Sequence, residues 1–300
     1  MENFHFRKKM QRIKLTLTLL FFTLGSIIIA SPKYEVIKLW DNPQTKKEVR
    51  PELRIFRPQS NIKKSKTCIL ICPGGSYHHL GLTNEGSEVA EYFNQWGVTA
   101  IVLRYRVSMR GNHHPAMIED FQRAMQIIHS NAEKWGIENI GAIGFSAGGH
   151  LVTMGGAFYK DNYLKKKGIE VNEEILRPAF VCPIYPVVSM QDSIAHQKSR
   201  VDLLTKEYTK ADLNHFSMEQ QIPNDMPPVF LLACKDDDVV DYRNSEVLHK
   251  ALERNGIPCE YHLMNEGGHG FGIIRTKSEE TKNWGFILKN WLIKNNFLKY

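Results

Sequence analysis

The sequence has few cysteines, and none of them lies at the spacing of a metal site. Only five occur among 300 residues, at Cys68, Cys72, Cys182, Cys234 and Cys259. An odd, scattered set excludes the disulfide framework of a small secreted domain, and the lack of Cys-x-x-Cys or Cys/His spacing argues against zinc. Because each cysteine lies in an apolar run, we expect buried free thiols that pack as small apolar side chains, with one disulfide as the alternative.

Long hydrophobic runs are also lacking. One apolar run, residues 15–30, is slightly short for a bilayer span, and five basic side chains precede it in residues 7–14. A basic start, a short apolar run and a small residue at its end predict a signal peptide over residues 1–30, cleaved after Ala30. Residues 31–300 would then be secreted or periplasmic, without stable membrane association. The alternative is an uncleaved N-terminal anchor.

The chain has no strong charge of one sign once this leader is set aside. The formal net charge is +7, of which the leader carries a net +4, so that +3 remains on residues 31–300. No basic stripe with interleaved aromatic side chains accompanies this charge, and we therefore expect no nucleic-acid partner. The length and the 42% hydrophobic content suit one large domain over residues 31–300.

Short β-branched runs alternate with amphipathic stretches along this domain, without internal repeats. This alternation predicts an α/β fold with a doubly wound, mostly parallel sheet covered on both faces. We expect strands at 34–39, 53–56, 67–72, 98–103, 140–143, 179–184, 229–234 and 259–264, and helices at 85–96, 115–135, 243–255 and 279–294. The polar, proline-ended segment 187–227 is expected to form a small lid above the strand ends, where ligands bind in such sheets.

A serine stands between two glycines where the strand at 140–143 meets the next helix. The spacing is Gly144-Phe145-Ser146-Ala147-Gly148. In a nucleophile elbow, a sharp turn holds the serine in strained geometry, so the residues two before and two after it must be small. The following helix N-terminus favours developing negative charge. Ser146 is therefore our candidate nucleophile, and the chain is predicted to be a serine hydrolase.

A serine nucleophile needs a base and an acid that orients the base. In hydrolases built on this kind of sheet, the chain order is serine, acid, histidine. The predicted strand 229–234 is followed by three aspartates, and the usual acid-x-Val-Val spacing before Val239 and Val240 selects Asp237. Asp236 is the alternative acid, and an ordinary solvated turn is the alternative interpretation of all three carboxylates.

His269 is the candidate base, because glycines on both sides let its loop fold back toward the serine. The other histidines lack this context, and we expect His150, on the helix after the elbow, to have a structural role. The pairs His78-His79 and His113-His114 lack carboxylate or cysteine partners at ligand spacing, so no metal is expected. No organic cofactor is expected either.

A glycine loop follows the predicted strand at 67–72, where lipases and esterases carry their oxyanion loop. It runs Pro73-Gly74-Gly75-Ser76-Tyr77-His78. Glycines let backbone amides approach the reacting carbonyl, and we expect an oxyanion hole built from the amides of Gly75, Ser76 and Ala147. Tyr77 and His78 are expected at the substrate.

Taken together, these motifs resemble those of secreted bacterial acetyl-xylan and related carbohydrate esterases, within the acetyl esterase/lipase class. The resemblance covers nearly all of residues 65–295. Further segments that carry it are Leu103-Arg104-Tyr105-Arg106, His114-Pro115, Ile184-Tyr185-Pro186-Val187-Val188 and Gly267-Gly268-His269-Gly270-Phe271-Gly272. The chain departs from the pattern at Ser76, where relatives often have a third glycine, and at Asp241, which replaces a common proline.

The resemblance implies an α/β-hydrolase fold and hydrolysis of short acyl esters, acetyl or feruloyl, on xylan-type carbohydrate, with a small-molecule or oligosaccharide ester as the partner. Two other functions are alternatives. A serine peptidase of the prolyl-oligopeptidase type would share this catalytic domain, but no propeller domain precedes the motifs. An inactive hydrolase fold that only binds carbohydrate would not need the candidate triad and the glycine loop, all of which are present.

Overall fold

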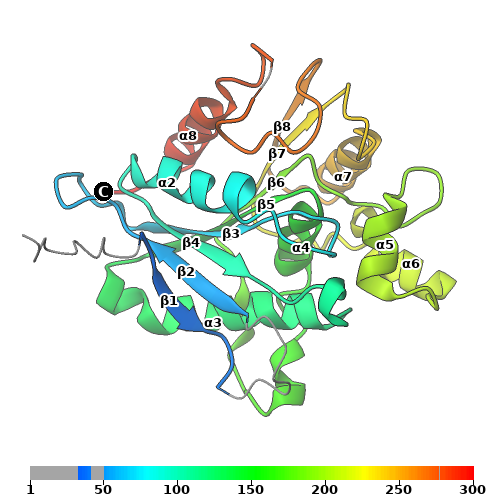
Figure 1. The fold of residues 1–300 in the computed structure, drawn as a ribbon, viewed down its shortest axis with the longest axis horizontal. Coiled ribbons are helices and arrows are strands. Elements are labelled where there is room, and N and C mark those ends of the chain that lie inside the picture. Colours follow the sequence, from blue (N-terminus) through cyan, green and yellow to red (C-terminus); the bar gives the residue numbers. More distant parts are fainter. Residues whose placement is uncertain (1–32, 42–50, 277) are drawn as a thin grey trace, which may run out of the picture. The chain divides into compact units, whose positions relative to one another are not determined.

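The computed structural model describes residues 33–41, 51–276 and 278–300. The predicted leader, residues 1–30, lies outside the described residues. The domain that the structure describes is built on one eight-stranded sheet, with strand order β1-β2-β4-β3-β5-β6-β7-β8 (Figure 1). The strands are β1 (Glu35–Lys38), β2 (Glu52–Phe56), β3 (Thr67–Cys72), β4 (Thr99–Arg104), β5 (Asn139–Phe145), β6 (Val181–Ile184), β7 (Val229–Cys234) and β8 (Cys259–Met264).

The sheet is mostly parallel. β1 pairs antiparallel with β2, and β2 antiparallel with β4, whereas every pair from β4 to β8 is parallel. The predicted α/β fold with a mostly parallel sheet is confirmed. Because β3, β5, β7 and β8 run in the same direction, the loops that follow them leave the sheet at the same edge, where ligands bind in open parallel sheets. These are the loops that carry the candidate site residues.

Helices cover both faces of the sheet (Figure 1). They are α2 (Glu88–Asn94), α3 (Ala116–Trp135), α4 (Ala147–Ala157), α5 (Gln197–Leu204), α6 (Lys210–Phe216), α7 (Arg243–Arg254) and α8 (Trp284–Lys294). Side chains of α2 and α8 share one buried apolar cluster with one sheet face. Those of α3, α4 and α7 share a second cluster with the other face.

The ends of some elements differ from the predicted ranges. The stretch at 85–96 begins with a π turn (Thr83–Ser87) before α2, and the helix predicted from 279 begins only at Trp284. Short 3₁₀ turns at Ser108–Arg110, Tyr163–Lys167, Glu173–Leu176 and Met218–Gln220 were not predicted, since such turns lack a hydrophobic repeat. Gly97 follows α2 with φ of 74°, the left-handed conformation expected of a helix terminator.

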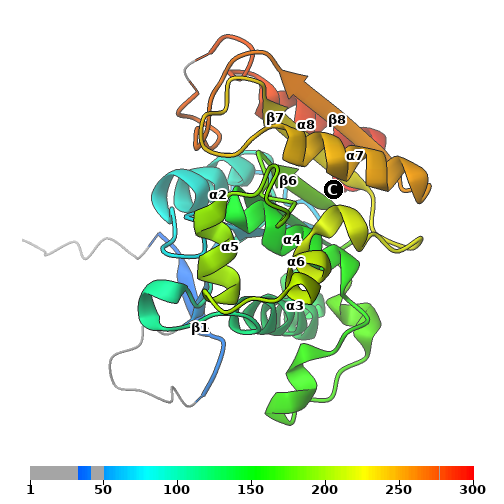
Figure 2. The same cartoon turned by 90° about the vertical axis from the view of Figure 1, so that its right-hand side faces the viewer.

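The segment 187–227 contains α5, α6 and a 3₁₀ turn. Figure 2 shows α5 and α6 in front of α4, and a hydrogen bond of 2.8 Å joins His150 Nε2 on α4 to the carbonyl of Phe216 on α6. That the segment 187–227 acts as a lid stays a prediction.

All five cysteines are free, and four of them are buried, so the alternative of one disulfide is wrong.

Among the residues that the structure describes, no helix is long and apolar enough to cross a membrane.

Candidate active site

Ser146 lies on a sharp turn between β5 and α4. Its backbone has φ of 54° and ψ of −119°, a strained conformation for a residue other than glycine. A Cβ on Gly144 would lie 2.0 Å from the carbonyl oxygen of Gly148, and a Cβ on Gly148 would lie 2.0 Å from the carbonyl oxygen of Cys72. Both positions therefore require glycine for steric reasons, as the elbow pattern predicts.

Replacing Gly148 with alanine is expected to destabilise the fold by roughly 3 kcal/mol, because backbone must move to admit the methyl group. The displaced turn should also slow any hydrolysis that depends on Ser146. Thermal unfolding and turnover of p-nitrophenyl acetate measure the two effects. Gly156→Ala on the same helix is the matched control, since its Cβ would meet only side-chain atoms, the nearest at 3.2 Å. If both variants unfold at the wild-type temperature, the steric argument is wrong.

The structure brings the three candidate triad residues together. His269 Nε2 lies 2.9 Å from Ser146 Oγ, and His269 Nδ1 lies 2.7 Å from Asp237 Oδ2. All three side chains are largely buried, with Ser146 only 5% exposed. The imidazole thus connects hydroxyl and carboxylate in one line, at distances suited to general-base activation of the serine.

Two neighbouring aspartates have different places in this arrangement. Asp237 Oδ1 accepts hydrogen bonds of 2.9 Å from the amides of Val239 and Val240, which leaves Oδ2 for the imidazole. Asp236 instead accepts from the amides of Gly267 and Gly268, at 3.1 and 2.8 Å. Asp237 therefore contacts the histidine side chain, whereas Asp236 holds the backbone of the loop that carries it.

The glycine loop after β3 lies against the elbow. A Cβ on Gly74 would lie 2.8 Å from the Cβ of Ser146. Gly75 and Ser76 have φ of 124° and 59°, so the serine that replaces a third glycine adopts a left-handed backbone. Within the described part of the chain, no protein acceptor bonds the amides of Gly75, Ser76 and Ala147, so these donors remain available for an oxyanion.

Tyr77 and His78, both expected at the substrate, differ in exposure: the first is buried and the second is partly exposed. Tyr77 is fully buried, with its hydroxyl 2.8 Å from His150 Nδ1. Burial lowers the pKa of His150 to about 4, so this imidazole is neutral, and its bond to Phe216 O places the proton on Nε2. Nδ1 then accepts from the Tyr77 hydroxyl. Tyr77 thus fastens the glycine loop to α4 from beneath and does not face solvent.

His78, in contrast to Tyr77, is partly exposed. Its Nδ1 is 3.2 Å from Ser108 Oγ and 3.5 Å from Asp202 Oδ1 on α5. This contact joins the glycine loop to the segment 187–227, and the exposed part of the ring remains open to a ligand. Among the described residues, no group of three or more His, Cys, Asp or Glu side chains is placed to hold a metal ion.

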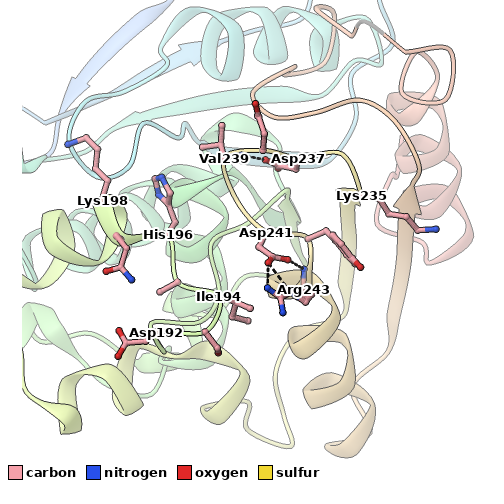
Figure 3. Close-up of a pocket in the computed structure, with 14 residues that line it drawn as sticks. Asp192, Ile194, His196, Lys198, Lys235, Asp237, Val239, Asp241 and Arg243 are labelled. Carbon is pink, nitrogen blue, oxygen red and sulfur yellow. Dashed lines mark hydrogen bonds and ion pairs between the residues drawn. The ribbon is translucent and has the colours of Figure 1, made fainter.

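A cleft of about 660 Å³ opens beside Asp237. Residues 192–198 form one wall, and residues 235–243, including Asp237, form the other (Figure 3). His196 and Lys198 project from the first wall, while Asp241 and Arg243 pair with each other on the second. Tyr242 also belongs to this largely polar lining. Such a mixture of hydroxyl, charged and aromatic groups suits a hydroxyl-rich ligand.

Two buried residues next to the candidate triad, Glu85 and Tyr185, are not among the site residues predicted from the sequence. The Tyr185 ring centroid lies 4.8 Å from that of His269, and the Tyr185 hydroxyl bonds Glu85 Oε1 at 3.0 Å. The segment around Tyr185 contributes to the family resemblance, but no local pattern gives this tyrosine a role. Glu85 carries no local signal, because an acidic residue at a helix start is ordinary.

Comparison with known proteins places these observations in a family. The family model BD-FAE matches residues 53–252. The chain is 30% identical over 227 residues to endo-1,4-beta-xylanase B of Butyrivibrio fibrisolvens, and 28% identical over 230 residues to an acetylxylan esterase of Xylanibacter ruminicola. These matches cover 74% and 75% of this chain but only 35% and 44% of the relatives, so the chain spans less than half the length of either.

Solved structures show the same fold. An acetyl ester-xyloside bifunctional hydrolase from Caldicellulosiruptor lactoaceticus superposes with a TM-score of 0.79 at 30% identity, over 89% of this chain and 98% of that one. A thermophilic esterase from Thermogutta terrifontis superposes with a TM-score of 0.70 at 20% identity, over 89% and 94% of the two chains, which bears on the fold alone. The predicted α/β-hydrolase fold and the resemblance to carbohydrate esterases are confirmed.

Proposed function

This chain belongs to the BD-FAE family, and on that basis we propose that it is a serine carboxylesterase that hydrolyses short acyl esters, acetyl or feruloyl, on xylan-type carbohydrate. The observation that carries the proposal is the line of contacts from Asp237 through His269 to Ser146, with the nucleophile on a strained elbow. The names of the similar proteins support the choice of ester and carbohydrate.

In the proposed acylation step, Ser146 Oγ attacks the ester carbonyl carbon while His269 Nε2 accepts the hydroxyl proton. Asp237 stabilises the resulting imidazolium through Nδ1. The amides of Gly75, Ser76 and Ala147 donate to the oxyanion of the tetrahedral intermediate. When the carbon–oxygen bond to the sugar breaks, His269 gives its proton to the departing alkoxide, and the acyl group remains on Ser146.

Deacylation repeats the sequence with water in place of the serine. His269 removes a proton from water, the hydroxide attacks the acyl carbon, and the same amides hold the second oxyanion. Collapse of that intermediate returns the proton to Ser146 Oγ and releases the carboxylic acid. These steps use only side chains and amides of this chain, so the mechanism requires no cofactor.

We further propose that the carbohydrate part of the ester lies in the cleft between residues 192–198 and 235–243. The cleft adjoins Asp237, and its volume of about 660 Å³ accommodates more than one sugar unit. Tyr242 is one of the residues that line this cleft. In this proposal its ring packs against a sugar, and the polar side chains around it bond sugar hydroxyls.

Tyr242→Ala is expected to raise KM for acetylated xylo-oligosaccharides roughly 3- to 10-fold, because the variant loses an aromatic contact to the sugar. The rise should exceed any change in KM for p-nitrophenyl acetate, which has no sugar. Tyr300→Ala, which removes an exposed tyrosine outside the cleft, serves as control. An unchanged KM for the oligosaccharide would place the sugar elsewhere.

The substrate class is tested by incubating the protein with acetylated xylan and with feruloylated arabinoxylan and measuring the acids released. The proposal expects release of acetate, ferulate or both by the wild type, and none by Ser146→Ala. Turnover of aminopeptidase substrates without release of either acid would instead support the prolyl-oligopeptidase alternative.

We also propose that residues 1–30 form an export leader and that the remaining chain acts outside the cytoplasm. The basic residues before the apolar run support this proposal. N-terminal sequencing of the protein recovered from a bacterial host tests it directly. A mature chain that begins at Ser31 supports cleavage, whereas an intact Met1 in the membrane fraction supports the anchor.

A further inference from the structure

One buried carboxylate next to the candidate site belongs to none of its established parts. Glu85 lies in the π turn before α2 and is only 5% exposed. Burial raises the pKa of this carboxyl above its usual value, while hydrogen bonds from Gly74 and Tyr185 lower it in part. A buried acidic group is costly unless its oxygens are satisfied, so its contacts are informative.

Both oxygens of Glu85 accept hydrogen bonds from segments of the site. The amide of Gly74, in the glycine loop, donates to Oε2 at 2.8 Å. The hydroxyl of Tyr185 lies 3.0 Å from Oε1, and the same hydroxyl accepts from the amide of Gly272, in the histidine loop, at 3.0 Å. One carboxylate therefore connects the glycine loop to the histidine loop through a single tyrosine.

The direction of these bonds follows from counting protons. A tyrosine hydroxyl has one proton, and the Gly272 amide is already a donor to its oxygen. The proton of Tyr185 therefore points to Glu85 Oε1, and the carboxylate accepts on both sides, as an ionised carboxylate does. An amide side chain at position 85 could keep the bond from Gly74 but would present an NH₂ group to the tyrosine.

The connection lies directly behind the reacting groups. A Cβ on Gly74 would lie 2.8 Å from both Glu85 Oε2 and Ser146 Cβ, so one residue separates the carboxylate from the nucleophile. On the other side, the Tyr185 ring packs against the imidazole of His269. The neighbouring Asn84 adds a bond of 3.2 Å from its Nδ2 to the carbonyl of Gly270.

We propose that Glu85 is a positioning residue for ester hydrolysis, which sets the glycine loop and the histidine loop at a fixed separation around Ser146 by accepting from Gly74 and, through Tyr185, from Gly272. The inference rests on the proposed esterase function. It assigns Glu85 and Tyr185 to transition-state geometry and gives them no contact with the substrate, so their loss affects kcat more than KM.

Steady-state kinetics with p-nitrophenyl acetate tests this assignment. Glu85→Ala removes both bonds, and we expect kcat to fall roughly 10²-fold, the effect of misplacing reacting groups by about 1 Å, with KM changed far less. Glu85→Gln disturbs the bond from the Tyr185 hydroxyl, and Tyr185→Phe removes that hydroxyl, so each breaks the link to the histidine loop while the bond from Gly74 remains. Each should lose roughly 10-fold in kcat, less than Glu85→Ala, which loses both bonds. The double variant Glu85→Ala/Tyr185→Phe should lose no more than Glu85→Ala alone, because both changes break the same connection.

Glu88→Gln, the same exchange three residues along the chain, is the control, since Glu88 pairs with Arg275 at the surface and takes no part in the bonds of Gly74, Tyr185 and Gly272. Wild-type kcat in both Glu85→Gln and Tyr185→Phe would overturn the inference, as would losses that multiply in the double variant or that fall on KM alone. If Glu85→Ala does not fold, these two single variants decide. An inactive wild type would instead contradict the proposed esterase function.

Discussion

Replacing Ser146 with alanine is expected to abolish ester hydrolysis, with kcat for p-nitrophenyl acetate falling by at least about 10⁴-fold. Alanine fits the elbow and keeps the surrounding bonds of the histidine to Asp237, but it removes the only hydroxyl that lies 2.9 Å from the imidazole among the described residues. No acyl-enzyme can then form. Initial rates over a range of substrate concentration measure the loss.

Ser245→Ala is the matched control for this experiment, because Ser245 on α7 is at least as buried as Ser146 but lies outside the triad. It should retain wild-type kcat, with Tm close to that of the wild type in both variants. Residual turnover by Ser146→Ala at more than a hundredth of the wild-type rate would remove this serine from the mechanism.

Asp237→Asn is expected to lower kcat by about 10⁴-fold while the protein stays folded. The asparagine side chain matches aspartate in size, but it cannot stabilise the imidazolium, and its amide favours the wrong tautomer of His269. In Asp237 one oxygen accepts from the amides of Val239 and Val240 while the other faces His269. An asparagine has only one acceptor oxygen and cannot serve both sides. The pre-steady-state rate of acylation reports the loss.

Asp236→Asn is the neighbouring control and separates the two acids that the sequence left open. Asp236 holds only backbone amides of the histidine loop, so its exchange should loosen that loop and cost much less than the exchange at Asp237. If the Asp236 variant were the more damaged of the two, Asp236 would be the acid that orients the base.

The sheet could be predicted from the sequence because its central strands are continuous apolar runs. The predicted strands 67–72 and 229–234 form β3 and β7, in which every residue is buried. Element ends were less predictable where no side chain caps the first turn, as in α8, whose N-cap residue Asn283 makes no side-chain hydrogen bond to the helix.

The candidate triad could be proposed from local patterns because each pattern has a direct physical cause. The two glycines around Ser146 are required by contacts of 2.0 Å. The acid-x-Val-Val spacing corresponds to the two amide bonds that the Val239 and Val240 backbones give to Asp237. A pattern of this kind records a constraint within a few residues, so a single sequence suffices to find it.

Other parts of the site depend on contacts between distant segments, which no local pattern records. The bond between Tyr77 and His150 spans 73 positions, and that between Tyr185 and Glu85 spans 100. Whether a tyrosine after a glycine loop faces the ligand or the core depends on the left-handed backbone at Ser76 and Tyr77, with φ of 59° and 61°. The sequence shows the loop but not the direction of that ring.

The central claim is that the hydroxyl of Ser146 is made nucleophilic by His269 and Asp237, and covalent labelling tests it most directly. The wild-type protein is treated with a fluorophosphonate, digested and analysed by mass spectrometry. We expect one adduct, on the peptide that contains Ser146, with labelling strongly slowed in Asp237→Asn and absent in Ser146→Ala. An adduct on another residue, or ester hydrolysis by a protein that takes up no label, would contradict the account.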